Sequence, residues 1–159
     1  MSLDQGILNH LRAFLTGSDA HISFDEAIDG LPVGLRGAKH PSVPHTPWRL
    51  IEHMRIAQWD ILEFSRNPLH ISPEFPDGYW PSGDGPPDPR AWDKSVEAFR
   101  GDLRAMIALV EDPQVDLVAP IPHGDGQTIL REALLIADHN AYHLGQFVVL
   151  RKLLEAQEN

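Results

Sequence analysis

The chain has 159 residues, no cysteine and a formal net charge of −10, with 23 acidic and 13 basic side chains. The length suits a single domain with its own core, and without cysteine a metal site has to use histidines and carboxylates. The negative charge argues against a nucleic-acid partner, because nonspecific affinity for phosphate backbones comes from Lys and Arg.

The N-terminus, Met1 to Gln5, has neither a basic start nor an apolar stretch, so no secretory signal is predicted. We expect a cytoplasmic protein with no membrane partner. Apolar residues then recur at helical intervals from Leu3 to Leu15, which predicts a first helix. A short second helix is predicted after Ser23, because Ser23 and Glu26 have the capping-box spacing. An irregular loop should follow over residues 33–46.

Thr46 and Pro47 predict a helix start, since a capping hydroxyl is followed by proline at the first helical position. This helix should run to about Arg66, with His53 near its apolar face. Residues 68–89 contain seven of the 14 prolines and predict a long loop. Three aromatic residues of this loop are expected to pin it to the body of the protein: Phe75, Tyr79 and Trp80.

Asp88 and Pro89 repeat the cap-plus-proline pattern and predict a further helix to about Val110. After a connection rich in proline and glycine, the last helix is predicted from Thr128 to Leu154. It is apolar on nearly every side, which predicts a central, buried helix. Four long helices, one short helix and no strand pattern predict an all-α protein, a four-helix bundle with long crossover loops.

His139 and His143 stand four residues apart, so both imidazoles lie on one face of the last helix. That face also carries apolar side chains, and His53 points inward from another helix. If the two helices are neighbours, three imidazoles converge and leave coordination positions open for water or substrate. The zinc-protease motif is excluded, because Asn140 stands where HExxH requires glutamate. The alternative is three structural histidines without a metal.

The segments that carry a family resemblance are Gly124–Thr128 and Ala137–Gln146, together with Trp48–His53 and Tyr79–Pro81. With them the chain resembles the DinB-like (DinB/YfiT) superfamily along nearly its whole length. The resemblance implies a single four-helix-bundle domain over residues 1–159 and a homodimer. It also implies a divalent metal, nickel or zinc, bound by a histidine triad. By position in the motifs, the ligands are His53, His139 and His143.

Three further side chains are candidates for supporting this site: Gln146, three residues after His143, Glu132, one heptad before His139, and His123 in the preceding loop. We assign no catalytic residue from the sequence. The histidines outside this set, among them His45 and His70, are predicted to be surface or loop residues.

The resulting hypothesis is a divalent-metal-dependent enzyme that acts on a small molecule, either as a thiol-dependent transferase or by hydrolysis. The resemblance implies a low-molecular-weight thiol as a cosubstrate of the transferase reaction. The alternative is a non-catalytic, metal-binding stress-response protein of the same fold. The sequence does not decide between these two functions.

Overall fold

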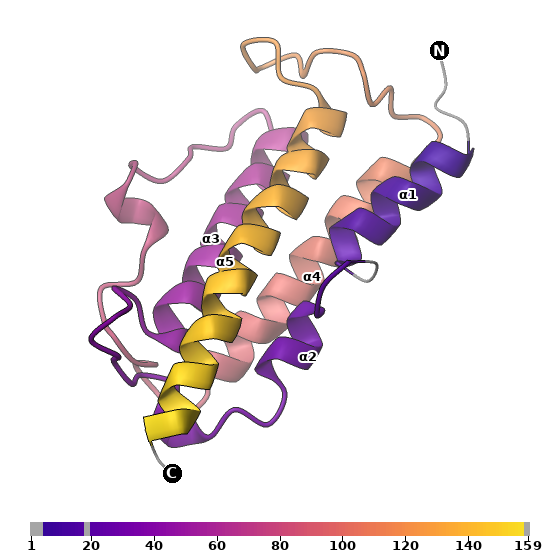
Figure 1. Cartoon of the computed structure of the whole chain (residues 1–159). Helices are drawn as coiled ribbons and strands as arrows, with labels where there is room; N and C mark the ends of the chain where they lie inside the picture. The colour runs from indigo at the N-terminus through magenta and orange to yellow at the C-terminus, as the bar shows by residue number, and fades with distance from the viewer. Residues whose placement is uncertain (1–4, 18–19, 158–159) are drawn as a thin grey trace.

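The computed structural model describes residues 5–17 and 20–157, and this part of the chain is helical. Within it there are five α-helices, two 3-10 helices and two isolated β-bridges, but no strand. The α-helices are α1 (Gln5–Thr16), α2 (Phe24–Ile28), α3 (Pro47–Arg66), α4 (Ala91–Glu111) and α5 (Ile129–Gln157), and the 3-10 helices are η1 (Val33–Leu35) and η2 (Asp77–Tyr79) (Figure 1). The predicted all-α class is confirmed, while Leu3 lies outside the described residues.

Two of the predicted helix starts are confirmed by their hydrogen bonds. At α2, the backbone N–H of Ser23 donates to Glu26 Oε2 at 2.9 Å, and the backbone N–H of Glu26 donates to Ser23 Oγ at 3.3 Å. At α3, Thr46 Oγ1 accepts from the backbone N–H of Arg49 at 3.2 Å, with Pro47 as the first helical residue. These bonds satisfy N–H groups that have no partner inside the helix.

The predicted start of α4 is wrong by two residues. The helix begins at Ala91 with Arg90 at the cap position, and no side chain caps it. Asp88 Oδ1 instead accepts from the backbone N–H of Arg90 at 2.8 Å, and the Asp88 carbonyl accepts from Ala91 N–H at 3.1 Å. Asp88 and Pro89 therefore form a turn that precedes the helix. Asp side chains often stabilise such turns by accepting a hydrogen bond from the backbone N–H two residues later.

The core lies between the four longer helices, with α3 packed extensively against both α4 and α5. Leu50, Ile51 and Met54 of α3 are fully buried, as are Phe147 and Leu150 of α5. Together with residues of α2 and α4 they form one apolar cluster. A second cluster joins α1, α4 and the first half of α5. The face of α3 that carries His53 is therefore packed against α5.

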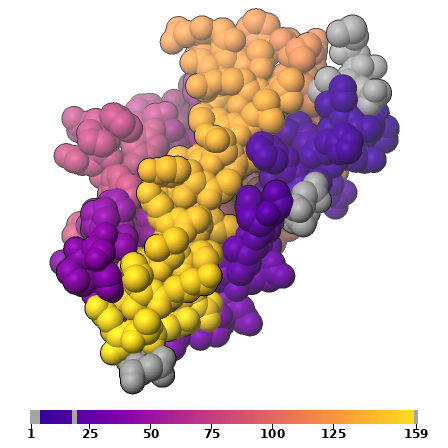
Figure 2. Space-filling model, viewed as in Figure 1, coloured from indigo at the N-terminus to yellow at the C-terminus, as the bar shows by residue number. Residues whose placement is uncertain are grey.

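The prediction that α5 is buried on nearly every side is only partly right. The helix packs against all four other α-helices, but Leu134, Tyr142 and Val149 are 43%, 65% and 56% exposed. Figure 2 shows α5, coloured from orange to yellow, running uncovered across this face of the molecule. Among the described residues, no helix combines the length and the apolar character needed to cross a membrane.

A chain of amide groups crosses the core beside the histidine-bearing faces. Gln58 is 1% exposed, and its Nε2 donates to the carbonyl of Phe99 on α4 at 2.7 Å. Its Oε1 accepts from Asn140 Nδ2 of α5 at 2.8 Å. Because buried amides are costly without partners, these two bonds favour one register of α3 against α4 and α5.

The last turns of α5 are joined to α2 by Arg151. Its Nη1 donates to the carbonyl oxygens of Ala27 at 2.8 Å and Asp29 at 2.6 Å, at the end of α2. A guanidinium at a helix C-terminus satisfies free carbonyl groups and compensates their partial negative charge. Leu154, 2% exposed, adds apolar contact in the same cluster as α2.

The loop between α3 and α4 lies along the outer side of α3 (Figure 1). The prediction that its three aromatic residues pin it is wrong for Phe75, which is 84% exposed. Tyr79 and Trp80 are half-buried and contact residues of α3. Phe75 reaches only the edge of Tyr79, with ring centroids 6.1 Å apart.

Candidate metal centre

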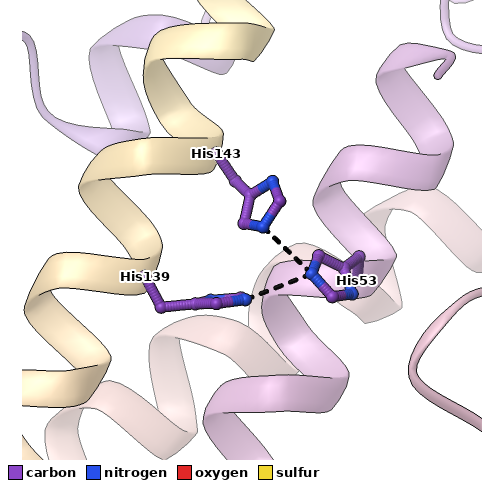
Figure 3. A group of neighbouring side chains, drawn as sticks. All are labelled: His53, His139 and His143. Atoms are coloured by element: carbon purple, nitrogen blue, oxygen red, sulfur yellow. Dashed lines mark hydrogen bonds between the residues drawn. The ribbon is translucent and has the colours of Figure 1, made fainter. Parts of the chain in front are cut away.

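Three histidine side chains converge between α3 and α5 (Figure 3). His53 comes from α3, and His139 and His143 come from successive turns of α5. His53 Nε2 lies 3.1 Å from Nε2 of His139 and 3.1 Å from Nε2 of His143. One ring nitrogen of each residue lies within 4.8 Å of the other two. Zinc–nitrogen bonds at tetrahedral angles place ligand nitrogens about 3.3 Å apart, so this spacing fits a first-row divalent cation.

The outward-facing nitrogens of His53 and His143 determine what these two rings present to each other. His53 Nδ1 lies 2.8 Å from the carbonyl oxygen of Tyr79, and His143 Nδ1 lies 2.9 Å from Gln146 Oε1. Both oxygens only accept, so both Nδ1 atoms carry the proton of the neutral ring. Each Nε2 is then an unprotonated acceptor. Two lone pairs facing each other at 3.1 Å repel unless a cation or a proton lies between them.

Burial disfavours a proton between the Nε2 atoms of His53 and His143, because it disfavours the charged imidazolium. It lowers the pKa of His53 to about 4, a shift reinforced by the charges of His143 and His45 and opposed by the hydrogen bond to Tyr79. Burial, with the charges of His143 and His53, also lowers the pKa of His139 to about 4. The pKa of His143 is lowered by burial as well. Neutral imidazoles at pH 7 are the form that binds metals.

Aromatic rings enclose the centre on the side of His53. Trp80 stacks on the His53 ring with centroids 3.8 Å apart and 2° between the planes, and His45 stacks on Trp80 at 4.2 Å. On the other side, the edge of Tyr142 meets His143 at 4.9 Å. His53 and His143 are only 7% and 8% exposed, whereas His139 is partly exposed.

A sequence model of the DinB superfamily matches residues 20–147. The chain belongs to the DinB superfamily. The matched segment begins before α2 and includes all three histidines of the centre. No curated protein and no solved structure gives a match to the chain.

Of the three supporting residues predicted for this DinB-superfamily chain, Gln146 contacts the triad. Glu132 is 2% exposed, and its carboxylate accepts from Arg131 Nη1 at 2.6 Å. It lies seven residues before His139, which is about 10 Å along the helix. His123 is exposed and bonds to the carbonyl of Phe64 at 2.6 Å.

Phe64 stands 11 residues after His53 on α3, about 16 Å along the axis, so His123 lies far from the three rings. Glu132 and His123 were candidates because of their positions along the chain. Such positions do not show which groups the side chains contact. Their contacts in the structure belong to the start of α5 and the end of α3.

Three groups around the centre are not predicted from the sequence. The carbonyl of Tyr79 leaves no trace in the sequence, because every residue has one. Trp80 was expected as a loop anchor, and it is the ring that covers His53. His45 was expected at the surface or in a loop. It does lie in a loop, but its Nδ1 is buried without a hydrogen-bond partner among the described residues.

Proposed function

We propose that this DinB-superfamily protein is a divalent-metal-dependent enzyme that acts on a small molecule at His53, His139 and His143. The observation that carries the proposal is the opposition of unprotonated Nε2 atoms at 3.1 Å, with the Nδ1 atoms of His53 and His143 already engaged. A divalent cation would relieve this repulsion and accept all three lone pairs. Three imidazoles leave further coordination positions for a substrate.

A cation held there supplies Lewis acidity, which lowers the pKa of a nearby nucleophile such as water or a thiol. The residues of this chain orient the ligands: Tyr79 fixes the ring of His53 through its carbonyl oxygen, and Gln146 fixes the ring of His143. Trp80 excludes water from one face of His53. These contacts orient the nitrogens of His53 and His143 before any substrate arrives, as catalysis by a preorganised site requires.

We further propose nickel or zinc as the metal and a low-molecular-weight thiol as a cosubstrate. Imidazole ligands suit both metals, and the family resemblance supports the thiol. The alternative function, a non-catalytic metal-binding stress-response protein, has the same centre. It is favoured by the pairing of the buried Glu132 carboxylate with Arg131, because this carboxylate was a candidate for supporting the site.

Metal analysis of protein purified without a histidine tag tests the centre. We expect about one divalent ion per chain after reconstitution with zinc or nickel, and its loss in His143→Ala. His10→Ala is the matched control, because His10 is an exposed histidine of α1 and should leave metal content unchanged. Failure of the wild-type chain to bind either metal would remove the proposal and leave three structural histidines.

A reaction panel separates the enzyme from the non-catalytic alternative. Metal-loaded protein is incubated with low-molecular-weight thiols and electrophilic acceptors, and separately with hydrolysable esters and amides. Turnover that disappears in His143→Ala and survives in His10→Ala supports the enzyme. Stoichiometric metal without turnover on any acceptor favours the non-catalytic function.

The packing of α1, α3, α4 and α5 against one another supports the four-helix-bundle arrangement, and we propose it for this chain. We also propose a homodimer formed through the exposed stripe of α5 that contains Leu134, Tyr142 and Val149. Light scattering tests the dimer: Tyr142→Glu should yield the mass of a monomer. A wild-type monomer at micromolar concentration would exclude it.

A further inference from the structure

The loop between α3 and α4 supplies two groups of the metal centre but is not held by its largest apolar side chains. It provides the Tyr79 carbonyl that binds His53 and the Trp80 ring that covers His53. Yet Leu69, Ile71 and Phe75 are 86%, 87% and 84% exposed. Burial of these side chains contributes little to holding the loop, so other contacts have to position the two groups.

Asp60 of α3 makes contacts that meet this need. Its side chain is 10% exposed, and each carboxylate oxygen accepts one hydrogen bond from the loop. Tyr79 Oη donates to Asp60 Oδ2 at 2.6 Å, and His70 Nε2 donates to Asp60 Oδ1 at 2.7 Å. His70 lies in the loop, as one of the two predicted positions for it has it, but its side chain is only 7% exposed. Asp60 thus binds both ends of the segment from His70 to Tyr79.

Tyr79 connects Asp60 to the metal centre; the hydrogen bonds of Asp60 with His70 and Tyr79 are called the clasp below. Asp60 follows His53 by seven residues on α3, so the two side chains lie on the same face, about 10 Å apart along the axis. Tyr79 spans that distance, with its hydroxyl on Asp60 and its carbonyl on His53. The next residue, Trp80, stacks on His53. Movement of Tyr79 would therefore change both the tautomer and the covering of His53.

We propose that Asp60 is a positioning residue of the metal centre, which clasps the loop at His70 and Tyr79 and thereby fixes the ring of His53. The expected effect on metal binding rests on the function proposed above. The hydrogen bonds from His70 and Tyr79 to Asp60 form without metal. Hydrogen bonds to a carboxylate are stronger than those between neutral groups, and a buried carboxylate left without partners is costly. Both effects favour the closed loop.

The test compares three variants. Asp60→Leu removes both hydrogen bonds and keeps the branched shape of the side chain, with methyl groups in place of the two oxygens. Asp60→Asn is the conservative variant, because its Oδ1 accepts from Tyr79 and its Nδ2 donates to the other tautomer of His70. Met106→Ala is the matched control, since Met106 is fully buried in the second apolar cluster, on α4, and should lower stability without touching the loop.

Two measurements are made on metal-free protein: amide hydrogen exchange over residues 68–80 and ¹⁵N shifts of the His53 ring. In Asp60→Leu we expect faster exchange in the loop and a mixture of His53 tautomers, with both near wild type in Asp60→Asn. Zinc affinity is then measured by chelator competition. We expect Kd to rise about 10- to 100-fold in Asp60→Leu, the range for loss of groups that orient metal-bound histidines.

In Met106→Ala the zinc Kd should stay unchanged while the melting temperature falls. If Asp60→Leu does not fold, Tyr79→Phe removes the hydroxyl contact alone and should show the same changes with smaller size. Wild-type hydrogen exchange and a wild-type His53 tautomer in Asp60→Leu, or in Tyr79→Phe if Asp60→Leu does not fold, would overturn the proposal. A loss of zinc affinity in Met106→Ala equal to that in Asp60→Leu would also overturn it. A wild-type chain that binds no metal would refute the proposed function, and the metal-free measurements would still decide the clasp.

Discussion

Replacement of His53 by alanine tests the metal centre through the stability of the whole protein. A ligand that binds only the folded state stabilises it by about 2.7 kcal/mol at 100 times its Kd. For a chain of this size, each kcal/mol raises the melting temperature by about 2 to 4 °C. Zinc at that concentration should therefore raise the melting temperature of the wild-type protein by about 5 to 11 °C.

In His53→Ala the centre keeps two ligands on one helix and loses the ligand from α3. If Kd rises about 100-fold, the stabilisation at the same zinc concentration falls to about 0.4 kcal/mol, or about 1 to 2 °C. Differential scanning calorimetry with and without zinc measures both shifts. His10→Ala, in an exposed position of α1, should keep the wild-type shift. A full zinc shift in His53→Ala would refute the inference that three nitrogens share one ion.

Three further predictions concern the metal centre and the apolar core. Gln146→Leu should weaken zinc binding about 10- to 100-fold, because His143 Nδ1 loses its acceptor; chelator competition measures this, and an unchanged Kd would contradict it. Metal-free protein should lose stability as the pH falls from about 6.5 toward 4, because His53 and His139 take up protons at higher pH unfolded than folded; a flat urea-denaturation profile from pH 7 to 4.5 would contradict it. Met106→Ala should cost about 2 to 5 kcal/mol of unfolding free energy in urea titrations, and a loss below about 1 kcal/mol would mean that the cavity collapses.

The convergence of the three histidines was predictable because helical periodicity gives direction as well as spacing. His139 and His143 stand one turn apart, and the apolar residues around them indicate which way that face points. The same reasoning oriented His53, which is 7% exposed. Periodicity does not show that α3 and α5 are neighbours. The structure shows this, with Nε2 atoms 3.1 Å apart.

The clasp at Asp60 was not predictable from periodicity. Asp60 lies on the same face as His53, but an acidic residue on a helix is usually solvated, and its two partners come from an irregular loop. Loop conformation depends on many weak contacts rather than on a repeating pattern. The same reason explains Phe75, whose apolar character suggested burial although the loop leaves it 84% exposed.

The contacts of Arg151 bear on where the cooperative folding unit of this protein ends. The segment that matches the DinB superfamily stops at residue 147, but Leu150 and Leu154 are buried beyond it, and Arg151 binds the end of α2. At the other end, α1 precedes the matched segment and buries Leu11 against α4 and α5. A fragment cut at the limits of the family match would expose both surfaces, so the thermodynamic unit is longer than the family segment.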